Sequence, residues 1–462
     1  MSTASTHQSD VFELLPLLEK YNRPGPRYTS YPTAPVFNTS YTAADHEKQL
    51  RETSDNISLY VHLPFCDTLC YFCGCTMLVS NNRERVANYL NYLDREIEKT
   101  GELVKGKNII QLHWGGGTPT HLTPTEIRTL GQKLHKHFTF SPDAEISVEI
   151  DPREIGEDHI RALADVGFRR ASIGVQDIDE KVQEAINRIQ PEELTREVIG
   201  WCRKNGFESI NVDLIYGLPY QSRASFNATV EKVLTFEPDR LALYNFAYVP
   251  WLKPHQKLIQ IDTLPQTDEK LLLFADATTR FMEAGYDYIG MDHFAKPNDE
   301  LALARKDGTL QRNFQGYSTR AGRDLVGLGM SAISHIGPSF SQNEKVLDKY
   351  YARIDKGELP VIAGLQMTDD DLLREHVIMR LMCDFHLEKA KVEKKYGIEF
   401  NTYFADSLER LKELEADGLA INAADAVTIT DNGRFFIRNI AMCFDAYLPK
   451  MQTAKPMFSK TL

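Results

Sequence analysis

From Ile57 onward, short apolar runs alternate with longer stretches in which apolar residues recur at helical spacing. The short runs predict strands and the longer amphipathic stretches predict helices. Because a parallel crossover needs a connection of helix length, this alternation predicts a parallel sheet with helices outside it. Gly167, Gly206 and Gly285 are placed as helix stops. The predicted strands are 57–63, 108–114, 144–150, 169–175, 209–215 and 240–246, and the predicted helices include 86–99, 124–138, 158–166 and 194–204.

Six or more such units predict an α/β fold with a full or partial (β/α) barrel over residues 56–350. A doubly wound sheet is the second interpretation, although no dinucleotide-type glycine fingerprint follows the first strand. Residues 1–55 hold a Pro- and Tyr-rich stretch, 25–34, which suits an extended arm. Residues 360–462 predict a small, mostly helical α+β domain of winged-helix character. It opens with Thr368 as N-cap and closes with a hairpin at 420–430 and a helix at 433–447.

Composition narrows the class of protein. The chain has 462 residues, 42% of them hydrophobic, and a net charge of −12, which excludes disorder, collagen and coiled coil. Overall acidity argues against a protein that coats nucleic acid or an anionic membrane. Residues 1–10 show no secretory signal, and no apolar stretch is long enough to span a bilayer. We therefore expect a cytoplasmic protein, and, since no segment demands a dimer, a monomer.

Four of the seven cysteines, Cys66, Cys70, Cys73 and Cys75, fall within ten residues after the first predicted strand. In a cytosolic protein, clustered thiols indicate metal ligands or redox groups rather than disulfides. Core packing would not be expected four times in one loop. A dithiol redox motif would use one CxxC pair and leave the other two cysteines unexplained.

Two metal sites compete for this cluster. A structural zinc site usually takes a second pair of ligands, which is missing here, although His62 and His113 could assist. A CxxxCxxC triad can instead bind three irons of a 4Fe-4S cluster and leave one iron open to a ligand. The remaining Cys202, Cys383 and Cys443 stand in apolar, helical surroundings and predict packing residues.

Polar and glycine-rich motifs follow several predicted strands. Residues 114–119 include three glycines, which allow close approach of a ligand, although a plain turn is an alternative. Glu149 and Asp151 lie two apart, hence on one strand face, where a carboxylate could bind ribose hydroxyls or simply face solvent. Successive strand ends with such groups predict a pocket. The other candidates are Gln176, Arg188, Asp213, Tyr244 and Asn245.

The CxxxCxxC spacing after a first strand, with Phe72 before the third cysteine, resembles the radical S-adenosylmethionine (radical SAM) superfamily. Within it, the chain closely resembles the family of oxygen-independent coproporphyrinogen III oxidases, also called coproporphyrinogen dehydrogenases. The resemblance covers nearly the whole chain. The motifs that carry it are 25–32, 60–66, 70–75, 113–119, 213–217, 290–295, 312–317 and 329–334.

The resemblance implies a catalytic site with one 4Fe-4S cluster and two S-adenosylmethionine molecules. Cys66, Cys70 and Cys73 would ligate the cluster, and Cys75 would mark the branch without being a ligand. Tyr60, Gly116 and Glu149 would contact the S-adenosylmethionine on the cluster. The second molecule would be surrounded by Phe72, Gly117, Thr118, Gln176, Arg188, Asp213, Ala247 and Ile333.

The implied reaction is the oxidative decarboxylation of the ring A and B propionates of coproporphyrinogen III to vinyl groups, which gives protoporphyrinogen IX in haem biosynthesis. A reduced flavodoxin or ferredoxin would supply electrons. A haem chaperone of a related branch is the alternative, but that branch is expected to lack the arm motif and Cys75. A radical methyltransferase acting on RNA is disfavoured by the charge of −12.

A substrate with four propionates needs local positive charge, and arginine suits carboxylates because its fork binds both oxygens. Two segments could supply it. The candidates are Lys20, Arg23 and Arg27 in the first segment, and Arg305, Lys306, Arg312, Arg320 and Arg323 in the second.

Overall fold

The computed structural model describes residues 11–314, 316–319, 324–451 and 457–461. In this part of the chain the main sheet has twelve strands in the order β16-β15-β14-β13-β1-β4-β5-β6-β7-β8-β10-β9. Its centre is parallel from β13 to β8, and both ends are antiparallel. The six predicted strands are β1 (Asn56–Leu63), β4 (Asn108–Gly116), β5 (Thr139–Ile150), β6 (Arg170–Gln176), β7 (Ser209–Tyr216) and β8 (Arg240–Asn245).

The sheet curves but does not close, because its edge strands, β16 and β9, do not pair with each other among the described residues. The predicted partial barrel is therefore confirmed, and the doubly wound alternative is not needed. The remaining strands of the sheet are β9 (Asp287–Gly290), β10 (His293–Ala295), β13 (Asp324–Leu328), β14 (Ile333–Ile336), β15 (Ser339–Asn343) and β16 (Val361–Gln366).

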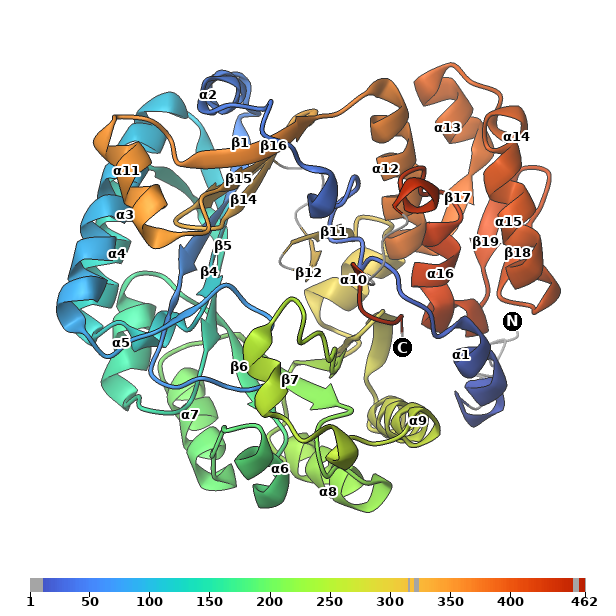
Figure 1. Ribbon diagram of the computed structural model, residues 1–462, viewed down its shortest axis with the longest axis horizontal. Coiled ribbons are helices and arrows are strands. Elements are labelled where there is room, and N and C mark those ends of the chain that lie inside the picture. Colours follow the sequence, from blue (N-terminus) through green and yellow to red (C-terminus); the bar gives the residue numbers. More distant parts are fainter. Residues whose placement is uncertain (1–10, 315, 320–323, 452–456, 462) are drawn as a thin grey trace.

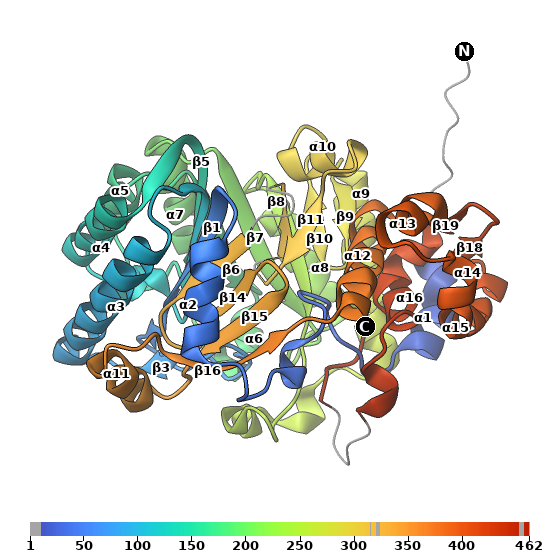
Figure 2. The same ribbon diagram turned by 90° about the horizontal axis from the view of Figure 1, so that it is seen from above.

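Helices cover the outer face of the curved sheet (Figures 1 and 2). The chain reverses after α5, α7 and α9 at Gly167, Gly206 and Gly285, each with positive φ, so these predicted stops are confirmed. A side chain would be strained in that backbone region. The outer helices are α3 (Arg83–Leu103), α4 (Pro124–His137), α5 (Glu157–Asp165), α6 (Glu180–Ala185), α7 (Glu192–Lys204), α8 (Arg223–Leu234), α9 (Thr267–Glu283) and α11 (Leu347–Asp355).

The amino-terminal segment crosses the open side of the barrel toward the C-terminal domain (Figure 1). Its Pro- and Tyr-rich stretch is non-helical as predicted, and Tyr28 and Tyr31 are buried. Tyr28 Oη donates to Asp445 at 2.9 Å, and the Ala446 N–H donates to Tyr31 Oη at 3.1 Å. An arm extended throughout 1–55 is wrong, because α1 (Leu15–Tyr21) and α2 (Ala43–Glu52) flank this stretch. Residues 1–10, where no secretory signal was expected, lie outside the described residues.

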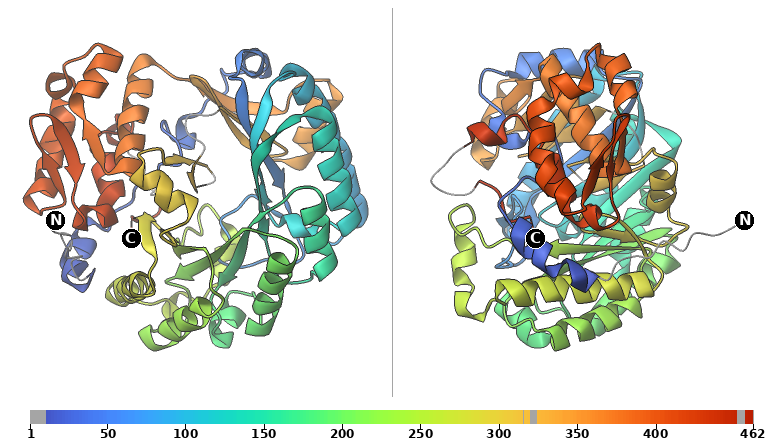
Figure 3. Two further views of the ribbon diagram at one scale, coloured as in Figure 1. Left: turned by 180° about the vertical axis from the view of Figure 1, so that it is seen from behind. Right: turned by 90° about the vertical axis from the view of Figure 1, so that its right-hand side faces the viewer.

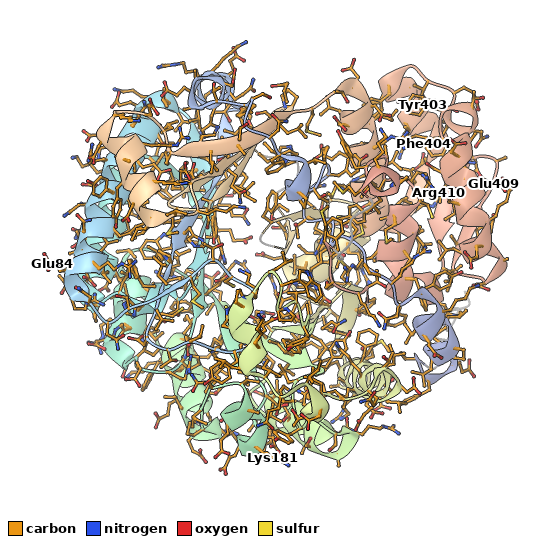
Figure 4. The ribbon with its side chains drawn as sticks, viewed as in Figure 1. Glu84, Lys181, Tyr403, Phe404, Glu409 and Arg410 are labelled. Carbon is orange, nitrogen blue, oxygen red and sulfur yellow. The ribbon has the colours of Figure 1, made fainter. Side chains whose placement is uncertain are left out.

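The C-terminal region packs beside α1 and α9 (Figures 1 and 3). Thr368 caps its first helix as predicted, because Thr368 Oγ1 accepts the Asp371 N–H at 3.2 Å. Phe404, labelled in Figure 4, lies in its aromatic core. The Phe404 ring is 4.8 Å from that of Phe400 and 5.6 Å from that of Phe444. Its elements are α12 (Asp369–Asp384), β17 (His386–Glu388), α13 (Lys389–Tyr396), α14 (Phe400–Tyr403), α15 (Ala405–Ala416), β18 (Ala420–Asn422), β19 (Ala426–Ile429) and α16 (Ile437–Met442).

Two predicted details at this end are corrected. The single helix expected over 433–447 is broken, and α16 ends at Met442. The carboxylate of Asp445 accepts the N–H groups of Tyr447 and Leu448, at 2.7 and 3.1 Å, which satisfies a turn instead of another helical turn. The main sheet also continues through β16, beyond residue 350 where the barrel was expected to end, because β16 pairs with β15.

A short hairpin lies inside the open side of the barrel, formed by β11 (Gln311–Asn313) and β12 (Gly316–Ser318) after α10 (Glu300–Lys306). Gln111 of β4 donates to Ser318 Oγ at 3.3 Å, so the hairpin reaches the inner face of the sheet. A second small pair, β2 (Phe65–Cys66) with β3 (Leu78–Val79), brackets the cysteine cluster. No helix of the described residues is long and apolar enough to cross a membrane.

Candidate active site

The cysteine cluster forms a loop at the carboxyl end of β1. Cys70 is buried, Cys66 and Cys73 are half-buried, and Cys75 is exposed; all four thiols are free. Burial raises the pKa of the Cys66 thiol. A hydrogen bond from Cys75 is the main influence on Cys73 and lowers the pKa of its thiol to about 7. The predicted core cysteines Cys202, Cys383 and Cys443 are buried, as expected.

Two guanidinium groups hold positive charge beside Cys70. Arg153 donates to Cys70 Sγ at 3.3 Å and Arg188 donates to it at 3.6 Å. Asp151 orients both arginines, at 2.7 and 2.9 Å. Burial alone would raise the pKa of Asp151, but Arg188 and Arg153 outweigh it and lower that pKa.

The opposite side of the loop is bound by residues that follow β8. His255 Nε2 lies 2.8 Å from the Cys73 carbonyl, and Lys253 donates to the Cys75 carbonyl at 2.9 Å. Gln256 Nε2 donates to the carbonyls of both Phe72 and Ala247 at 3.1 Å. The structure thus brings together two predicted site residues from segments far apart in the sequence. Lys253, His255, Gln256 and Arg153 were not predicted, because only the tertiary fold brings them to the loop.

Tyr60, Gly116 and Glu149 meet at the carboxyl ends of β1, β4 and β5, and we call them the strand-end edge. The Gly116 N–H donates to Glu149 Oε2 at 3.1 Å, and His113 Nε2 lies 3.5 Å from Glu149 Oε1. The Tyr60 ring stacks on His113 at 6.0 Å, and Tyr60 Oη lies 3.0 Å from His62 Nδ1. The predicted grouping of these three residues in space is therefore present.

Electrostatics at the strand-end edge favour an ionised carboxylate. Burial would raise the pKa of Glu149, but the hydrogen bond with His113 and that from the Gly116 N–H lower it below its usual value. Burial raises the pKa of Tyr60 well above its usual value, so its hydroxyl stays neutral. The Glu149 side chain is nevertheless 45% exposed, because it faces a cavity.

The glycines after β4 are required for close packing. A Cβ on Gly115 would lie 2.9 Å from the Glu149 carboxyl carbon, and one on Gly117 would lie 2.5 Å from the Pro64 carbonyl oxygen. Gly116 has φ of +124°, and its Cβ would lie 2.8 Å from His62 Cε1. A plain turn would not need three such positions, so the backbone here lies against Glu149, His62 and Pro64 with no room for a side chain.

Gln176, Arg188 and Asp213 lie on the neighbouring strands β6 and β7 or against them. Arg188 donates to the Gly174 carbonyl at 2.7 Å, and Gly174 is the register partner of Asp213. Asp213 accepts hydrogen bonds from Ser172 at 3.0 Å and Asn211 at 2.7 Å. Within the described residues, the buried Gln176 Oε1 and Arg188 Nε have no hydrogen-bond partner. Such atoms lack the hydrogen bond that a buried polar group normally makes.

Two residues predicted for the second cofactor, Thr118 and Ile333, lie apart from Gln176, Arg188 and Asp213. The Thr118 N–H donates to the Phe65 carbonyl at 2.8 Å, and its side chain lines a cavity beside Arg153. Ile333 is on β14, near Gly327, the register partner of Tyr60 on β13. Ile333 is therefore beside the first predicted cofactor group, whereas the sequence resemblance assigns it to the second.

A cavity on the inner face of the sheet connects the strand-end acids with aromatic residues, and we call it the inner-face cavity. It holds about 830 Å³ of empty space. Its size and its polar lining residues suit a ligand with several polar groups. Its lining includes His113, Glu149, Asp213, Tyr244, His293 and Tyr317.

The donor set fits an iron–sulfur cluster in its chemistry. Three thiols share one loop, two arginines lie beside one of them, and within the described residues Gln176 Oε1 and Arg188 Nε lack a hydrogen-bond partner. In the part of the chain that the structure describes, no three His, Cys, Asp or Glu side chains stand together as a metal-binding group. The ligand set therefore stays a prediction.

Comparison with known proteins gives concordant results. Residues 60–233 match the Radical SAM superfamily, and residues 367–436 match the HemN C-terminal domain. The oxygen-independent coproporphyrinogen III oxidase of Salmonella typhimurium is 44% identical over 97% of this chain and 98% of its own length. The corresponding protein of Helicobacter pylori is 41% identical over 96% and 98%. The solved structure of coproporphyrinogen III oxidase (HemN) from Escherichia coli aligns with a TM-score of 0.89 at 43% identity, and it covers 91% of this chain and 98% of that one.

An open parallel barrel with a cysteine loop at the end of its first strand defines a radical SAM enzyme. High identity along almost the full length of both chains sharpens the assignment. The chain belongs to the family of oxygen-independent coproporphyrinogen III oxidases, enzymes of haem biosynthesis.

Proposed function

We propose that this enzyme oxidatively decarboxylates the ring A and ring B propionates of coproporphyrinogen III to vinyl groups, giving protoporphyrinogen IX. The identity of 44% over 97% of the chain carries this proposal. Each propionate loses one hydrogen atom from its β carbon, carbon dioxide, and one electron, which passes to an external one-electron acceptor. Two S-adenosylmethionine molecules would accept the two hydrogen atoms and leave as methionine and 5′-deoxyadenosine.

Cys66, Cys70 and Cys73 would hold one 4Fe-4S cluster, with Cys75 outside the ligand set. When bound and reduced, such a cluster supplies the electron that splits S-adenosylmethionine into methionine and a 5′-deoxyadenosyl radical. A reduced flavodoxin or ferredoxin would be the donor. The protein would act as a cytoplasmic monomer.

The chain's own residues bind, orient and exclude water. Glu149, held ionised by His113 and the Gly116 N–H, would accept hydrogen bonds from the S-adenosylmethionine bound at the cluster. The neutral Tyr60 ring, stacked on His113, would close one side of that site. Arg188, Gln176 and Asp213, with Phe72, Gly117, Thr118, Ala247 and Ile333, would surround the second molecule.

The test is anaerobic incubation of the reconstituted protein with coproporphyrinogen III, S-adenosylmethionine and a reductant. We expect protoporphyrinogen IX and two equivalents of 5′-deoxyadenosine for each product. A protein with Cys70→Ser should form neither. Tight haem binding without porphyrinogen turnover would instead identify a haem chaperone and refute the proposal.

A further inference from the structure

The cationic residues predicted to bind substrate carboxylates differ in whether they are already paired with acids of the protein. Lys20 pairs at the surface with Asp417 at 2.6 Å and Glu413 at 3.1 Å. Arg305 and Lys306 both pair with Asp287, at 3.7 and 3.5 Å. Lys20 is therefore neutralised by carboxylates of the protein, and Arg305 and Lys306 share the single carboxylate of Asp287.

Among the other candidates, Arg23 is exposed, and Arg320 and Arg323 lie outside the described residues. Arg27 and Arg312 remain, and the fold brings them together from segments 285 residues apart, since Arg312 Nε donates to the Arg27 carbonyl at 3.4 Å.

Arg27, Asp292, Arg312 and Arg438 form a cluster that we call the arm junction. Arg27 of the arm pairs with Asp292 between β9 and β10. In the described structure, the four hydrogen bonds of the buried Arg438 go to backbone carbonyls of the arm and the C-terminal tail, not to an acid. The cluster thus has three guanidinium groups and one carboxylate, a net charge of +2 in a chain of net charge −12.

Arg312 carries the uncompensated part of this charge. It is 7% exposed, and within the described residues its Nη1 has no hydrogen-bond partner. Its guanidinium lies 4.8 Å from the Tyr317 ring centroid, which weakly stabilises a cation but does not neutralise it. Burial of an unpaired charge is costly, so a retained one suggests that a ligand supplies the counter-charge.

Arg312 lines a cavity of about 1140 Å³ of empty space between the arm, the β11–β12 hairpin and α12. The acidic side chains that line this cavity compete little with a ligand for Arg312. Burial raises the pKa of Glu375 to about 8, and its carboxyl group already lies 3.6 Å from His335 Nε2. The carboxylate of Asp324 is already occupied by the N–H groups of Ser54 and Gly337, each at 2.8 Å.

The Tyr317 ring, which lines the inner-face cavity, also contacts Arg312. The Tyr317 ring under Arg312 lies 5.4 Å from His293, and His293 lies 6.0 Å from Tyr244. All three rings line the inner-face cavity together with Glu149 and Asp213. A large substrate whose reacting group is near Glu149 could therefore extend another carboxylate toward Arg312.

We propose that Arg312 anchors a carboxylate subsite at the arm junction, which binds one propionate of the porphyrinogen substrate. Arg27 and Arg438 are positioning residues, because one presents its carbonyl to Arg312 and the other holds the arm. The inference rests on the proposed function. The planar guanidinium fork is suited to a carboxylate, whereas an ammonium group would bind it only as a point charge.

The test measures binding of coproporphyrin III, the stable oxidised form of the substrate, by fluorescence titration of the full-length reconstituted protein. Its tetramethyl ester is the uncharged comparison. Loss of a charge-assisted hydrogen bond in Arg312→Gln should weaken binding of the tetra-acid about 10- to 100-fold, with little effect on the ester. Arg312→Lys should recover part of the affinity.

Arg128→Gln is the matched control, because Arg128 pairs with Asp165 on the outer helices α4 and α5. It should bind both porphyrins like the unaltered protein. Binding of S-adenosylmethionine should be unchanged in Arg312→Gln. Reduced binding of S-adenosylmethionine with normal porphyrin affinity would instead assign the arginine to a cofactor carboxylate and overturn the inference.

Thermal unfolding separates a binding role from a structural one. Since Arg312 lacks a counter-charge, Arg312→Gln should unfold at the same temperature as the unaltered protein or above it. Equal affinity of Arg312→Gln and the unaltered protein for coproporphyrin III would overturn the subsite alone. Absence of coproporphyrin binding by the unaltered protein would overturn the proposed function together with it.

Discussion

The strand-end edge and the arm junction are both polar, but they are assembled in different ways. At the strand-end edge, Glu149 is satisfied by a backbone amide and a histidine from the neighbouring strand. At the arm junction, Arg312 has a buried nitrogen with no partner among the described residues. A site whose polar groups are already paired can bind a ligand with little reorganisation. A site with unpaired charge depends on the ligand for its neutralisation.

The largest effect is expected at the cysteine loop beside the strand-end edge. Cys66→Ser, Cys70→Ser and Cys73→Ser should each abolish the visible absorbance of the cluster, its iron content and all turnover. Cys75→Ser should keep most of the cluster, because Cys75 is exposed and outside the proposed ligand set. Anaerobic reconstitution followed by iron and sulfide analysis measures this. Equal loss in all four variants would show the ligand assignment to be wrong.

Removal of Arg438, which holds the arm to the C-terminal tail, should destabilise the protein. Arg438→Met leaves four carbonyls of the arm and the tail without their buried donor, and should lower the free energy of unfolding by about 3 kcal/mol. Denaturant unfolding and limited proteolysis of the arm measure the effect.

Arg95→Met is the control variant for Arg438→Met. The Arg95 side chain is 46% exposed and pairs with Asp355 at 2.8 Å. An exposed pair of this kind contributes about 1 kcal/mol or less. An equal loss of unfolding free energy in Arg95→Met and Arg438→Met would contradict the role of Arg438 in holding the arm.

The strand-end edge should respond to a single methyl group. Gly116→Ala places a side chain in a backbone conformation that favours glycine, 2.8 Å from His62, and should cost about 2 kcal/mol. It should also weaken S-adenosylmethionine binding, because the Gly116 N–H orients Glu149.

Gly200→Ala is the matched change, because Gly200 is exposed in α7 and its Cβ would meet nothing within 4 Å. It should stabilise the protein by up to about 1 kcal/mol. Thermal unfolding of the two variants measures both effects. An unchanged unfolding temperature in Gly116→Ala would refute the close packing around Gly116.

The two regions also differ in how far the sequence predicts them. Alternating periodicity located the six central strands, and glycines or acids directly after them indicated the strand-end edge, because parallel strands bring their carboxyl ends to one side. The arm junction is built from residues 27, 292, 312 and 438, and no local pattern records that Arg27 pairs with Asp292. The helices α1 and α2 were also missed, since proline and tyrosine signals of the intervening stretch dominated that segment.

The smallest expected effect concerns pH at the inner-face cavity. Burial raises the pKa of Asp213 to about 6, although hydrogen bonds from Ser172 and Asn211 and the charge of Arg188 oppose this, and Glu149 adds to it. S-adenosylmethionine carries a net positive charge, so the ionised carboxylate should bind it better. Affinity at the proposed second site should therefore be highest above pH 6 and fall about tenfold by one pH unit below it.

Calorimetric titration of the reconstituted protein between pH 5 and 8 measures this dependence, with circular dichroism to verify the fold at each pH. Asp213→Asn cannot ionise, so its affinity should be low and nearly independent of pH. A flat profile in the unaltered protein would remove Asp213 from the binding site. It would leave the strand-end edge, where Glu149 is held ionised by its neighbours, as the main source of negative charge for a cationic cofactor.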